Sequence, residues 1–417
     1  MENKKTYRWK ILALLFFATT INYIDRQVIG ILKPFISSDL GWGEADYGYI
    51  VTAFQVAYAI GLITTGRFLD KYGTRLGYLW AIIVWSIAGM AHAAARGVVS
   101  FALARFALGI GESANFPAAV KSVAEWFPKK ERAFATGLFN SGSTIGAIIA
   151  PVIVSAITLA FGWKWAFIIT GSLGFIWIVF WLAWYQVPEK HPKVSQEELK
   201  YIYQDDTETD VRPTLKWINL LKHKETIAIC STRFLSDWVW WFFLFWIPDY
   251  LNKAHGINLK DVVLPLIVIY AVSSLGGIGG GWLSSRFISS GRSIDFARKN
   301  TILICALMVL PVMMVSQIHH LWVAVGLIAL AAAGHQGWAS NIFTIISDIY
   351  PKQAVATMAG ISGFAGAVGG ALSASFVGLI LESTGSYFLI FMVASSVYLL
   401  NWIILKLSIK EIKPLVI

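Results

Sequence analysis

Four ionisable side chains that lie inside otherwise apolar stretches carry most of the chemical information in this sequence. Asp25 and Arg26 are adjacent in TTINYIDRQVIG, whereas Arg105 and Glu112 lie in RFALGIGESANFPA. A charged side chain at the centre of a membrane span costs about 2.5 to 3.5 kcal/mol, so such residues usually pair with one another or bind a ligand. Arg105 and Glu112 are seven residues apart, and two helical turns would place them on one face, about 10.5 Å apart along the axis. That face is expected to point inward, away from lipid.

These four residues predict an anion-binding site with two coupled carboxyl groups, Asp25 and Glu112. Counted from the ends of their helices, Asp25 and Arg105 lie within about 3 Å of the same depth, so an ion pair between them is allowed. Arg26 lies about 100° further round its helix and would then point toward a cavity. Protonation of a carboxyl group would release an arginine, whose guanidinium could bind a substrate carboxylate through two parallel hydrogen bonds. The alternative is that the four charges only neutralise one another as a buried network.

The composition places these residues in a membrane protein. Of the 417 residues, 57% are hydrophobic and 14% are charged, whereas soluble proteins carry about 25% charged residues, so a soluble globular enzyme is excluded. The net charge of +10 fits cationic loops at an anionic membrane surface better than nucleic-acid binding. Cys230 and Cys305 match neither a disulfide framework nor a zinc site, and the sequence shows no ATP-binding loop or catalytic nucleophile. We expect no enzymatic activity, no cofactor and no metal.

Twelve apolar stretches are long enough to cross about 30 Å of hydrocarbon as helices. The predicted spans comprise residues 10–33, 45–66, 76–95, 99–125, 133–160, 163–186, 225–251, 260–285, 299–317, 321–347, 353–381 and 386–405. The only long polar segment separates the sixth span from the seventh. The sequence thus predicts an all-α integral membrane protein with an N-terminal six-helix bundle (1–186), a linker (187–224) and a C-terminal six-helix bundle (225–417).

The distribution of Lys and Arg predicts the orientation of the chain, because these residues are retained on the cytoplasmic side of a membrane. The two ends and alternate loops hold 25 of the 34 Lys and Arg residues, the opposite loops hold 5, and 4 lie inside predicted spans. Both termini and the linker are therefore predicted to be cytoplasmic. No cleavable signal peptide is expected, since the basic start runs into an apolar stretch that is too long for a signal core.

Traces of an internal repeat, a feature typical of secondary transporters, relate the two halves of the chain. The motif GIGESAN in the fourth span aligns with GHQGWASN in the tenth. The loop GRFLDKYGTRLG (66–77) has a counterpart in GGWLSSRFISSGR (280–292). The second copy carries Ser285 where the first carries Asp70.

The loop GRFLDKYGTR resembles the short cytoplasmic loop between helices 2 and 3 of the major facilitator superfamily. Together with twelve spans, the six-plus-six division and cytoplasmic ends, this resemblance extends over nearly the whole chain. It implies a loop that braces the outward-open state, with Asp70 next to helix ends and basic side chains. A merely solvated basic turn is the alternative. The residues assigned to this gating loop are Gly66, Asp70, Gly73 and Arg75.

NYIDR in the first span and RF-x-L-G-x-GE-x-x-x-FP in the fourth resemble the anion:cation symporter branch of this superfamily. Members of the branch move organic anions such as sugar acids. The resemblance implies proton coupling through Asp25 and Glu112, and binding of the substrate carboxylate by Arg26 and Arg105. We therefore expect a proton-coupled symporter that works by alternating access.

The seventh and tenth spans indicate the substrate class. RFLSDWVWWFFLFW (233–246) brings aromatic rings that suit the C–H face of a sugar, and GHQGWASN (334–341) is unusually polar for a span. These motifs resemble those of the bacterial hexuronate transporters, which take up galacturonate and glucuronate, although Trp238 stands where that family has proline. Uptake of a hexuronate across the inner membrane is expected. The alternatives are another anion, such as galactonate, glucarate or a non-sugar carboxylate, and a membrane sensor that does not transport.

Further polar and aromatic side chains are expected to contact the substrate. They comprise Tyr23, Gln55, Tyr58, Asn115, Trp241, His335, Gln336 and Asn341. Arg233 and Asp237, spaced i,i+4, could either pair with each other or bind hydroxyls. A histidine such as His335 is more often a hydrogen-bonded structural residue than a proton carrier. The expected partners are an organic anion, protons and the lipid bilayer, and a monomer is expected.

Overall fold

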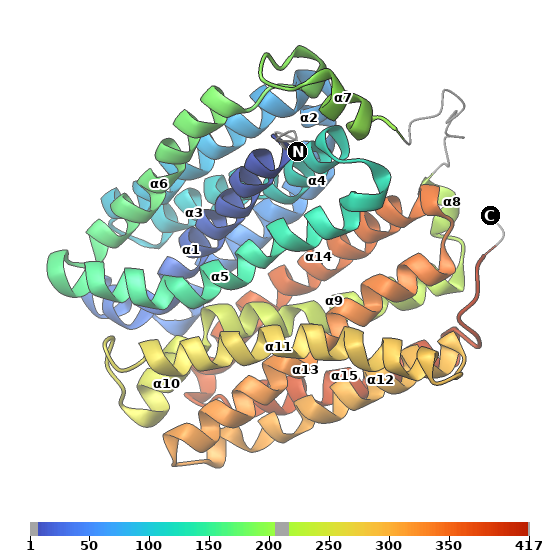
Figure 1. Ribbon diagram of the computed structural model, residues 1–417. Helices are drawn as coiled ribbons and strands as arrows, with labels where there is room; N and C mark the ends of the chain where they lie inside the picture. Colours follow the sequence, from blue (N-terminus) through green and yellow to red (C-terminus); the bar gives the residue numbers. More distant parts are fainter. Residues whose placement is uncertain (1–6, 205–216, 416–417) are drawn as a thin grey trace. The chain divides into compact units, whose positions relative to one another are not determined.

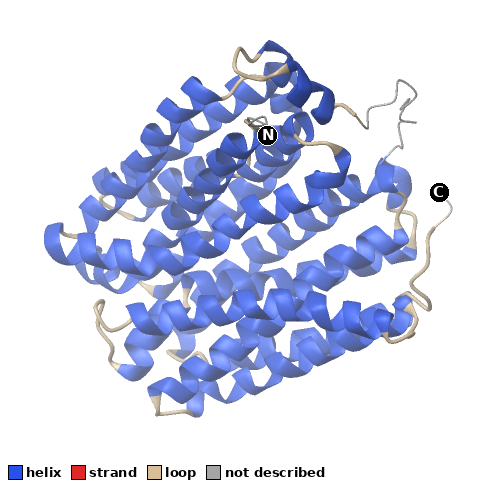
Figure 2. Ribbon diagram, viewed as in Figure 1, coloured by secondary structure: helices blue, strands red, loops and turns tan. Residues whose placement is uncertain are grey.

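The computed structural model describes residues 7–204 and 217–415, and helices are the only regular secondary structure within those ranges (Figure 2). The first half contains α1 (Arg8–Leu40), α2 (Glu44–Ala91), η1 (His92–Ala94), α3 (Val98–Glu112), α4 (Asn115–Trp126), α5 (Lys129–Phe161), α6 (Trp163–Trp184), η2 (Pro188–Lys190) and α7 (Gln196–Ile202) (Figure 1). The second half contains α8 (Trp217–Leu220), α9 (Lys224–Phe245), α10 (Ile247–His255), α11 (Val263–Ser289), α12 (Ile294–Val309), η3 (Leu310–Gln317), α13 (Leu321–Ile349), α14 (Lys352–Thr384) and α15 (Phe388–Ser408).

Each of the twelve predicted spans has a helical counterpart. The second and third spans share α2, which is interrupted at Gly73, where φ is 76° and ψ is 159°. Glycine adopts a positive φ readily and other residues do not, so Gly73 allows the chain to change direction between the two spans. Three spans are divided instead: the fourth into α3 and α4, the seventh into α9 and α10, and the ninth into α12 and η3.

Within the described ranges, eight helical stretches are long and apolar enough to cross a membrane, and one of them, 44–94, contains two predicted spans. The first, fourth and seventh predicted spans have no such stretch. These three spans carry Asp25, Arg26, Arg105, Glu112, Arg233 and Asp237. The fourth span is divided into α3, with 15 residues, and α4, with 12 residues, and each part alone is too short to cross a membrane. In the first and seventh spans, charged side chains lower the mean hydropathy, and such helices suit the protein interior better than lipid.

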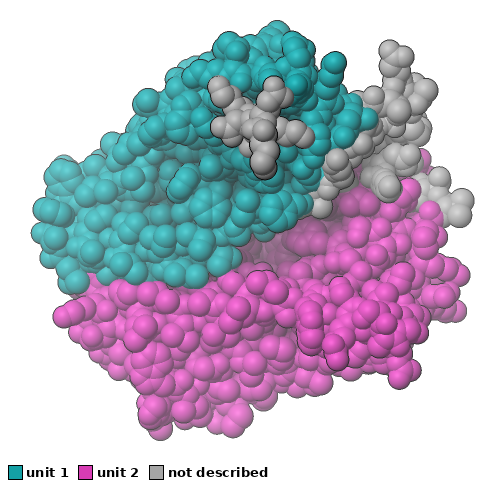
Figure 3. All heavy atoms as spheres, in the orientation of Figure 1, with its two compact units in different colours: residues 1–29, 56–211 teal, residues 30–55, 212–417 magenta. Residues whose placement is uncertain are grey.

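The chain divides into two compact units (Figure 3). Unit 1 comprises residues 1–29 and 56–211, and unit 2 comprises residues 30–55 and 212–417. The division predicted from the sequence placed segment 30–55 with the N-terminal bundle, and in the division by contacts it is grouped with residues 212–417. Both α1 and α2 therefore run from one unit into the other.

Part of the predicted linker is folded onto unit 1, and residues 205–216, which include the acidic stretch 205–210, lie outside the described residues. Glu198 of α7 is buried and accepts a hydrogen bond from the backbone N–H of Arg8 at 3.1 Å. The ring centroids of His191 and Tyr7 are 4.3 Å apart. Burial lowers the pKa of His191, which favours the neutral ring in this tilted contact. The segment that contains η2 and α7 thus packs against the start of α1.

Close backbone contact between α11 and α13 organises unit 2. A Cβ atom on Gly276 would lie 2.3 Å from the Cα of Ala333, and one on Gly280 would lie 2.6 Å from the Cα of Gly337. Small residues allow helices to approach this closely where lipid supplies no hydrophobic driving force. The crossing fixes α13, and with it the polar residues of GHQGWASN.

Candidate functional site

A buried ion pair between α1 and α3 forms the centre of the candidate site in unit 1. The Nε of Arg26 donates to Oε2 of Glu112 at 2.8 Å. Arg26 is 2% exposed and Glu112 is 0% exposed. Arg26 was predicted to point freely toward a cavity, but it is paired with Glu112.

The guanidinium of Arg26 is surrounded by polar and aromatic groups as well. Its Nη2 donates to Oδ1 of Asn22 at 3.1 Å. The rings of Tyr23 and Tyr58 lie with their centroids 4.8 and 4.9 Å from its Cζ, close enough for cation–π attraction. Asn22 and Tyr23 precede Arg26 by four and three residues, so all three share one face of α1. The predicted ligands Tyr23, Arg26 and Tyr58 thus lie together, and Asn22 joins them through a spacing that the sequence reasoning overlooked.

The second arginine, Arg105 of α3, contacts the backbone of α1. Its Nη2 donates to the carbonyl oxygen of Arg26 at 3.0 Å, and the residue is 0% exposed. Arg105 therefore ties α3 to α1 at the residue that carries the ion pair.

Asp25 is 3% exposed, and neither carboxylate oxygen makes a well-formed hydrogen bond among the described residues, although the side chain of Thr170 is near enough to donate one. Its electrostatic neighbours are Glu112, Thr170 and Arg105. The ion pair with Arg105 that the helix geometry allowed is thus not formed as a hydrogen-bonded contact. A buried carboxyl group whose oxygens are not hydrogen-bonded is unusual in a protein interior.

Asn115, another predicted ligand in unit 1, is already engaged by neighbouring helices. Tyr78 donates its hydroxyl to Oδ1 of Asn115 at 2.5 Å, and Nδ2 of Asn115 donates to Oγ1 of Thr19 at 3.4 Å. The side chain is 5% exposed. These hydrogen bonds link α4 to α2 and α1, so Asn115 helps to hold the three helices together.

The gating loop of unit 1 is braced by two basic residues. Lys121 of α4, one of the four basic residues predicted inside spans, lies 2.7 Å from Oδ1 of Asp70. Arg75 donates to Oε1 of Gln186 at 2.6 Å and to the carbonyl oxygen of Leu182 at 2.9 Å. The predicted contact of Asp70 with a basic side chain is thus present. Asp70 has a side chain that is 78% exposed, so solvent weakens this ion pair.

The two glycines of the gating loop differ in their conformations. A Cβ atom on either Gly66 or Gly73 would meet nothing within 4 Å. Only Gly73 has a positive φ, so only there does the backbone itself require glycine.

Two of the predicted ligands on α13 of unit 2, His335 and Asn341, contact neighbouring helices. Nδ1 of His335 lies 2.5 Å from the hydroxyl of Tyr398, and its ring stacks on Trp240 with centroids 5.6 Å apart. Nδ2 of Asn341 donates to the carbonyl oxygen of Gly280 at 3.1 Å. These contacts favour a structural role for His335, which was one of the two interpretations of this residue. The bond of Asn341 links α13 to α11. Gln336 of the same helix is half-buried.

Gln55 and Trp241 meet beside Gly370 of α14. A Cβ atom on Gly370 would lie 3.0 Å from Cδ1 of Trp241 and 3.3 Å from Oε1 of Gln55. Gln55 is 0% exposed, and neither end of its amide has a hydrogen-bond partner among the described residues. Buried amides are normally satisfied by hydrogen bonds, so the amide of Gln55 stands out among the residues predicted to contact the substrate.

Arg233 and Asp237 of α9 pair with each other. Nε and Nη2 of Arg233 both donate to Oδ2 of Asp237, at 2.9 and 2.7 Å. Gly366 leaves the room for this pair, since a Cβ atom there would lie 2.1 Å from the same oxygen. The intrahelical pairing is thus the alternative that the structure favours. α9 also continues without interruption through Trp238, where the hexuronate transporters were expected to have proline.

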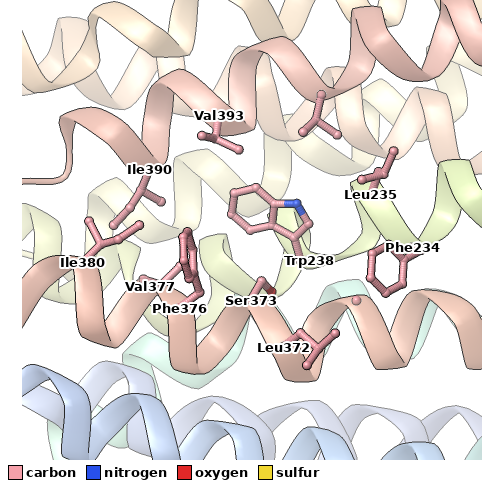
Figure 4. A pocket seen from close by; sticks show the side chains of 12 residues that line it. Phe234, Leu235, Trp238, Leu372, Ser373, Phe376, Val377, Ile380, Ile390 and Val393 are labelled. Carbon is pink, nitrogen blue, oxygen red and sulfur yellow. The ribbon is translucent and has the colours of Figure 1, made fainter.

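A cavity of about 430 Å³ lies between α9, α14 and α15 of unit 2 (Figure 4). Trp238 projects into it between apolar side chains of α14 and α15. The described residues that line it are Phe234, Leu235, Trp238, Gly369, Leu372, Ser373, Phe376, Val377, Ile380, Ile390, Val393 and Val397. Ser373 donates its hydroxyl to the carbonyl oxygen of Gly370 at 2.9 Å. None of these lining residues is charged, so the cavity does not suit a carboxylate.

A model of the Major Facilitator Superfamily matches residues 15–374. The chain belongs to this superfamily. It is 32% identical to the hexuronate transporter of Escherichia coli (strain K12) over 92% of this chain and 90% of that one. It is 30% identical to the probable galactarate/D-glucarate transporter of Bacillus subtilis (strain 168), over 98% and 94%. Among solved structures, a D-xylose–proton symporter superposes with a TM-score of 0.78 at 14% identity, over 98% of this chain and 99% of the other.

Membership of the Major Facilitator Superfamily establishes the fold and the general class of the protein. It is a multi-pass membrane transporter with the all-α major facilitator fold, and it is not an enzyme. Its curated relatives are transporters of sugar-acid anions, which supports an organic anion as the substrate. The likeness to the xylose symporter concerns the fold alone.

Asn341 bonds to a neighbouring helix whereas Gln336 is half-buried, so replacing each residue tests which of the two α13 amides stabilises the fold. Asn341→Ala removes the bond between α13 and α11 and should lower the free energy of unfolding by about 0.5 to 1.5 kcal/mol. Gln336→Ala removes the same amide from a half-buried neighbour and should leave stability close to that of the parent protein. Thermal unfolding of the purified variants measures the difference. Equal midpoints for the two variants would contradict the assignment.

Proposed function

We propose that the protein is a proton-coupled symporter that imports a hexuronate, such as galacturonate or glucuronate, across the inner membrane by alternating access. The observation that carries the proposal is the buried Arg26–Glu112 ion pair. The hexuronate transporter among the relatives supports the substrate class.

The ion pair suggests how proton and anion would be coupled. While Glu112 is ionised, it neutralises the guanidinium of Arg26. Protonation of Glu112 would remove that negative charge and leave the cation in a site that excludes water. A substrate carboxylate could then replace Glu112 and form the two-pronged contact that guanidinium favours. One proton would thus accompany one carboxylate.

Asp25 and Arg105 are proposed to assist this exchange. Asp25 is buried without a well-formed hydrogen bond among the described residues, as a second proton-accepting group would be. Arg105 holds the backbone of Arg26 in place and adds positive charge near both carboxyl groups. Tyr23 and Tyr58 are proposed to face the sugar acid beside the guanidinium.

The hydroxyl groups of a hexuronate would need neutral donors and acceptors. Gln55, Trp241 and Gln336 are the proposed ligands of this kind in unit 2. Hydroxyl recognition of this kind is specific, because a substrate that lacks the hydroxyl leaves a buried amide unpaired.

A diacid is the second candidate substrate, since one relative is a probable galactarate/D-glucarate transporter. A second carboxylate would require a second cation. In α9, Arg233 already directs two N–H groups to Asp237. This pairing favours a substrate with one carboxylate.

Uptake into proteoliposomes tests the function. Radiolabelled galacturonate or glucuronate should accumulate when the outside is made acidic, and accumulation should stop when the proton gradient is collapsed. Unlabelled galactonate and galactarate should compete weakly. Stronger competition by galactarate would make the diacid the substrate, and uptake that ignores the gradient would contradict proton coupling.

Glu112→Gln should abolish accumulation driven by a pH gradient, because the side chain can no longer exchange a proton. Exchange of internal for external substrate should persist, since the neutral amide leaves Arg26 available for the carboxylate. Glu197→Gln, on an exposed position of α7, is the matched control and should behave as the parent. Unimpaired proton-driven uptake by Glu112→Gln would falsify its role as the proton carrier.

Arg26→Lys should weaken substrate binding by about tenfold or more, because an ammonium group cannot make the forked contact. Binding of labelled galacturonate to the purified protein measures the loss. Arg96→Lys, at an exposed position between η1 and α3, serves as the control for the same exchange of side chains. If Arg26→Lys binds as tightly as the parent, the carboxylate is held elsewhere.

A further inference from the structure

A compact cluster of charges joins the end of α1, the start of α2 and α10 within unit 2. Nζ of Lys33 lies 2.6 Å from Oε2 of Glu44 and 2.6 Å from Oδ2 of Asp249. Lys253 forms ion pairs with the same two carboxylates, at 3.3 Å to Asp249. Tyr387 donates its hydroxyl to Asp249 at 2.5 Å. Each lysine thus contacts both carboxylates, and each carboxylate contacts both lysines.

Burial makes this cluster more than a solvated surface network. Lys33 and Asp249 are each 1% exposed. The ring centroid of Tyr47 lies 5.1 Å from Nζ of Lys33, and so covers the ammonium further. Ion pairs shielded from solvent are screened little by salt, and their separation leaves charges without water.

The cluster joins residues that are distant in the sequence. Lys33 and Glu44 lie in segment 30–55 of the N-terminal half, whereas Asp249 and Lys253 lie on α10. Three further hydrogen bonds support the same junction. They are the bonds from Ala45 N to Glu382 Oε2 (3.1 Å), from Tyr47 Oη to the carbonyl oxygen of Phe245 (2.8 Å), and between Thr52 Oγ1 and Ser375 Oγ (2.7 Å). These contacts explain why segment 30–55 belongs to unit 2.

We infer that Lys33, Glu44, Asp249 and Lys253 form a latch that fastens segment 30–55 to the C-terminal half and opens by exchange of partners. When the latch opens, Lys33 keeps Glu44 on one side and Lys253 keeps Asp249 on the other. Both retained pairs already exist in the structure. Each side has no net formal charge, so opening leaves no charge without a partner.

The second predicted span begins at the latch and ends at the gating loop, so the latch and the gating loop lie at opposite ends of that span. The end of α1 and the start of α2 are on the outer face in the orientation predicted from the Lys and Arg distribution. Segment 30–55 must leave α10 and α14 if it is to move with the rest of the N-terminal half. The latch would therefore set how readily the outer side opens, whichever anion is carried.

Thiol labelling of intact cells can report the state of the latch without any substrate. Thr52→Cys, introduced together with Cys230→Ala and Cys305→Ala, places a single thiol beside Ser375, where segment 30–55 meets α14. A membrane-impermeant maleimide added outside should label it slowly while the latch is closed. Because no substrate is present, the result is independent of the proposed function.

Lys253→Glu places a third carboxylate beside Glu44 and Asp249, and it should speed labelling by about three- to tenfold. Lys253 has a side chain that is 46% exposed, so the change should leave the fold intact. Lys260→Glu, an exposed lysine between α10 and α11, alters the net charge equally and should label at the parental rate.

The double variant Glu44→Lys with Lys253→Glu distinguishes exchange of partners from simple pairing. It keeps an opposite charge across the junction, but it leaves two like charges on each side, so the open arrangement is repelled. Labelling should fall below the parental rate by about threefold or more. Labelling as fast as in Lys253→Glu alone, or merely equal to the parent, would overturn the proposal, as would an unchanged rate in Lys253→Glu.

Discussion

A guanidinium buried in a membrane protein requires an anion, and the side chains around Arg26 in unit 1 meet that requirement. Glu112 supplies the anion, and Arg105 fixes the carbonyl of the residue that carries the guanidinium. Tyr23 and Tyr58 stabilise the cation through their ring faces, but neutral rings cannot replace a negative charge. Under the proposed function, Glu112 and a substrate carboxylate are therefore alternatives at one position.

The spans could be predicted from the sequence because the length of an apolar helix is set by the thickness of the membrane. The interruption of the fourth span after Glu112 and the break of the seventh at Trp246 could not, since such breaks depend on packing rather than on local composition. The contacts of segment 30–55 could not be predicted either. Contacts such as that between Lys33 and Asp249 join residues far apart in the sequence, and a division at the polar linker does not reveal them.

The candidate site was predictable in its residue types and less so in its contacts. Asp25, Arg26, Arg105 and Glu112 do lie near one another, but depth and angle along a helix did not identify the partner of Arg26, because a long side chain reaches beyond its own turn. Polarity alone also failed to separate ligands from packing residues. His335, Asn115 and Asn341 are bonded within the protein, as a polar group in a membrane helix must be if no ligand satisfies it.

The proposed carboxylate site and the proposed latch follow the same electrostatic constraint. An unpaired charge in a low-dielectric interior costs several kcal/mol, so a conformational change is accessible only if every charge finds a partner on both sides of it. Arg26 meets this condition by taking either Glu112 or a substrate anion, and Lys33 meets it by contacting two carboxylates at equal distance. Because Glu44 remains with Lys33 when Asp249 departs, the segment that carries both can move without stranding a charge. Ion pairs that would be costly as static supports are in this way suited to a protein that must alternate between two arrangements.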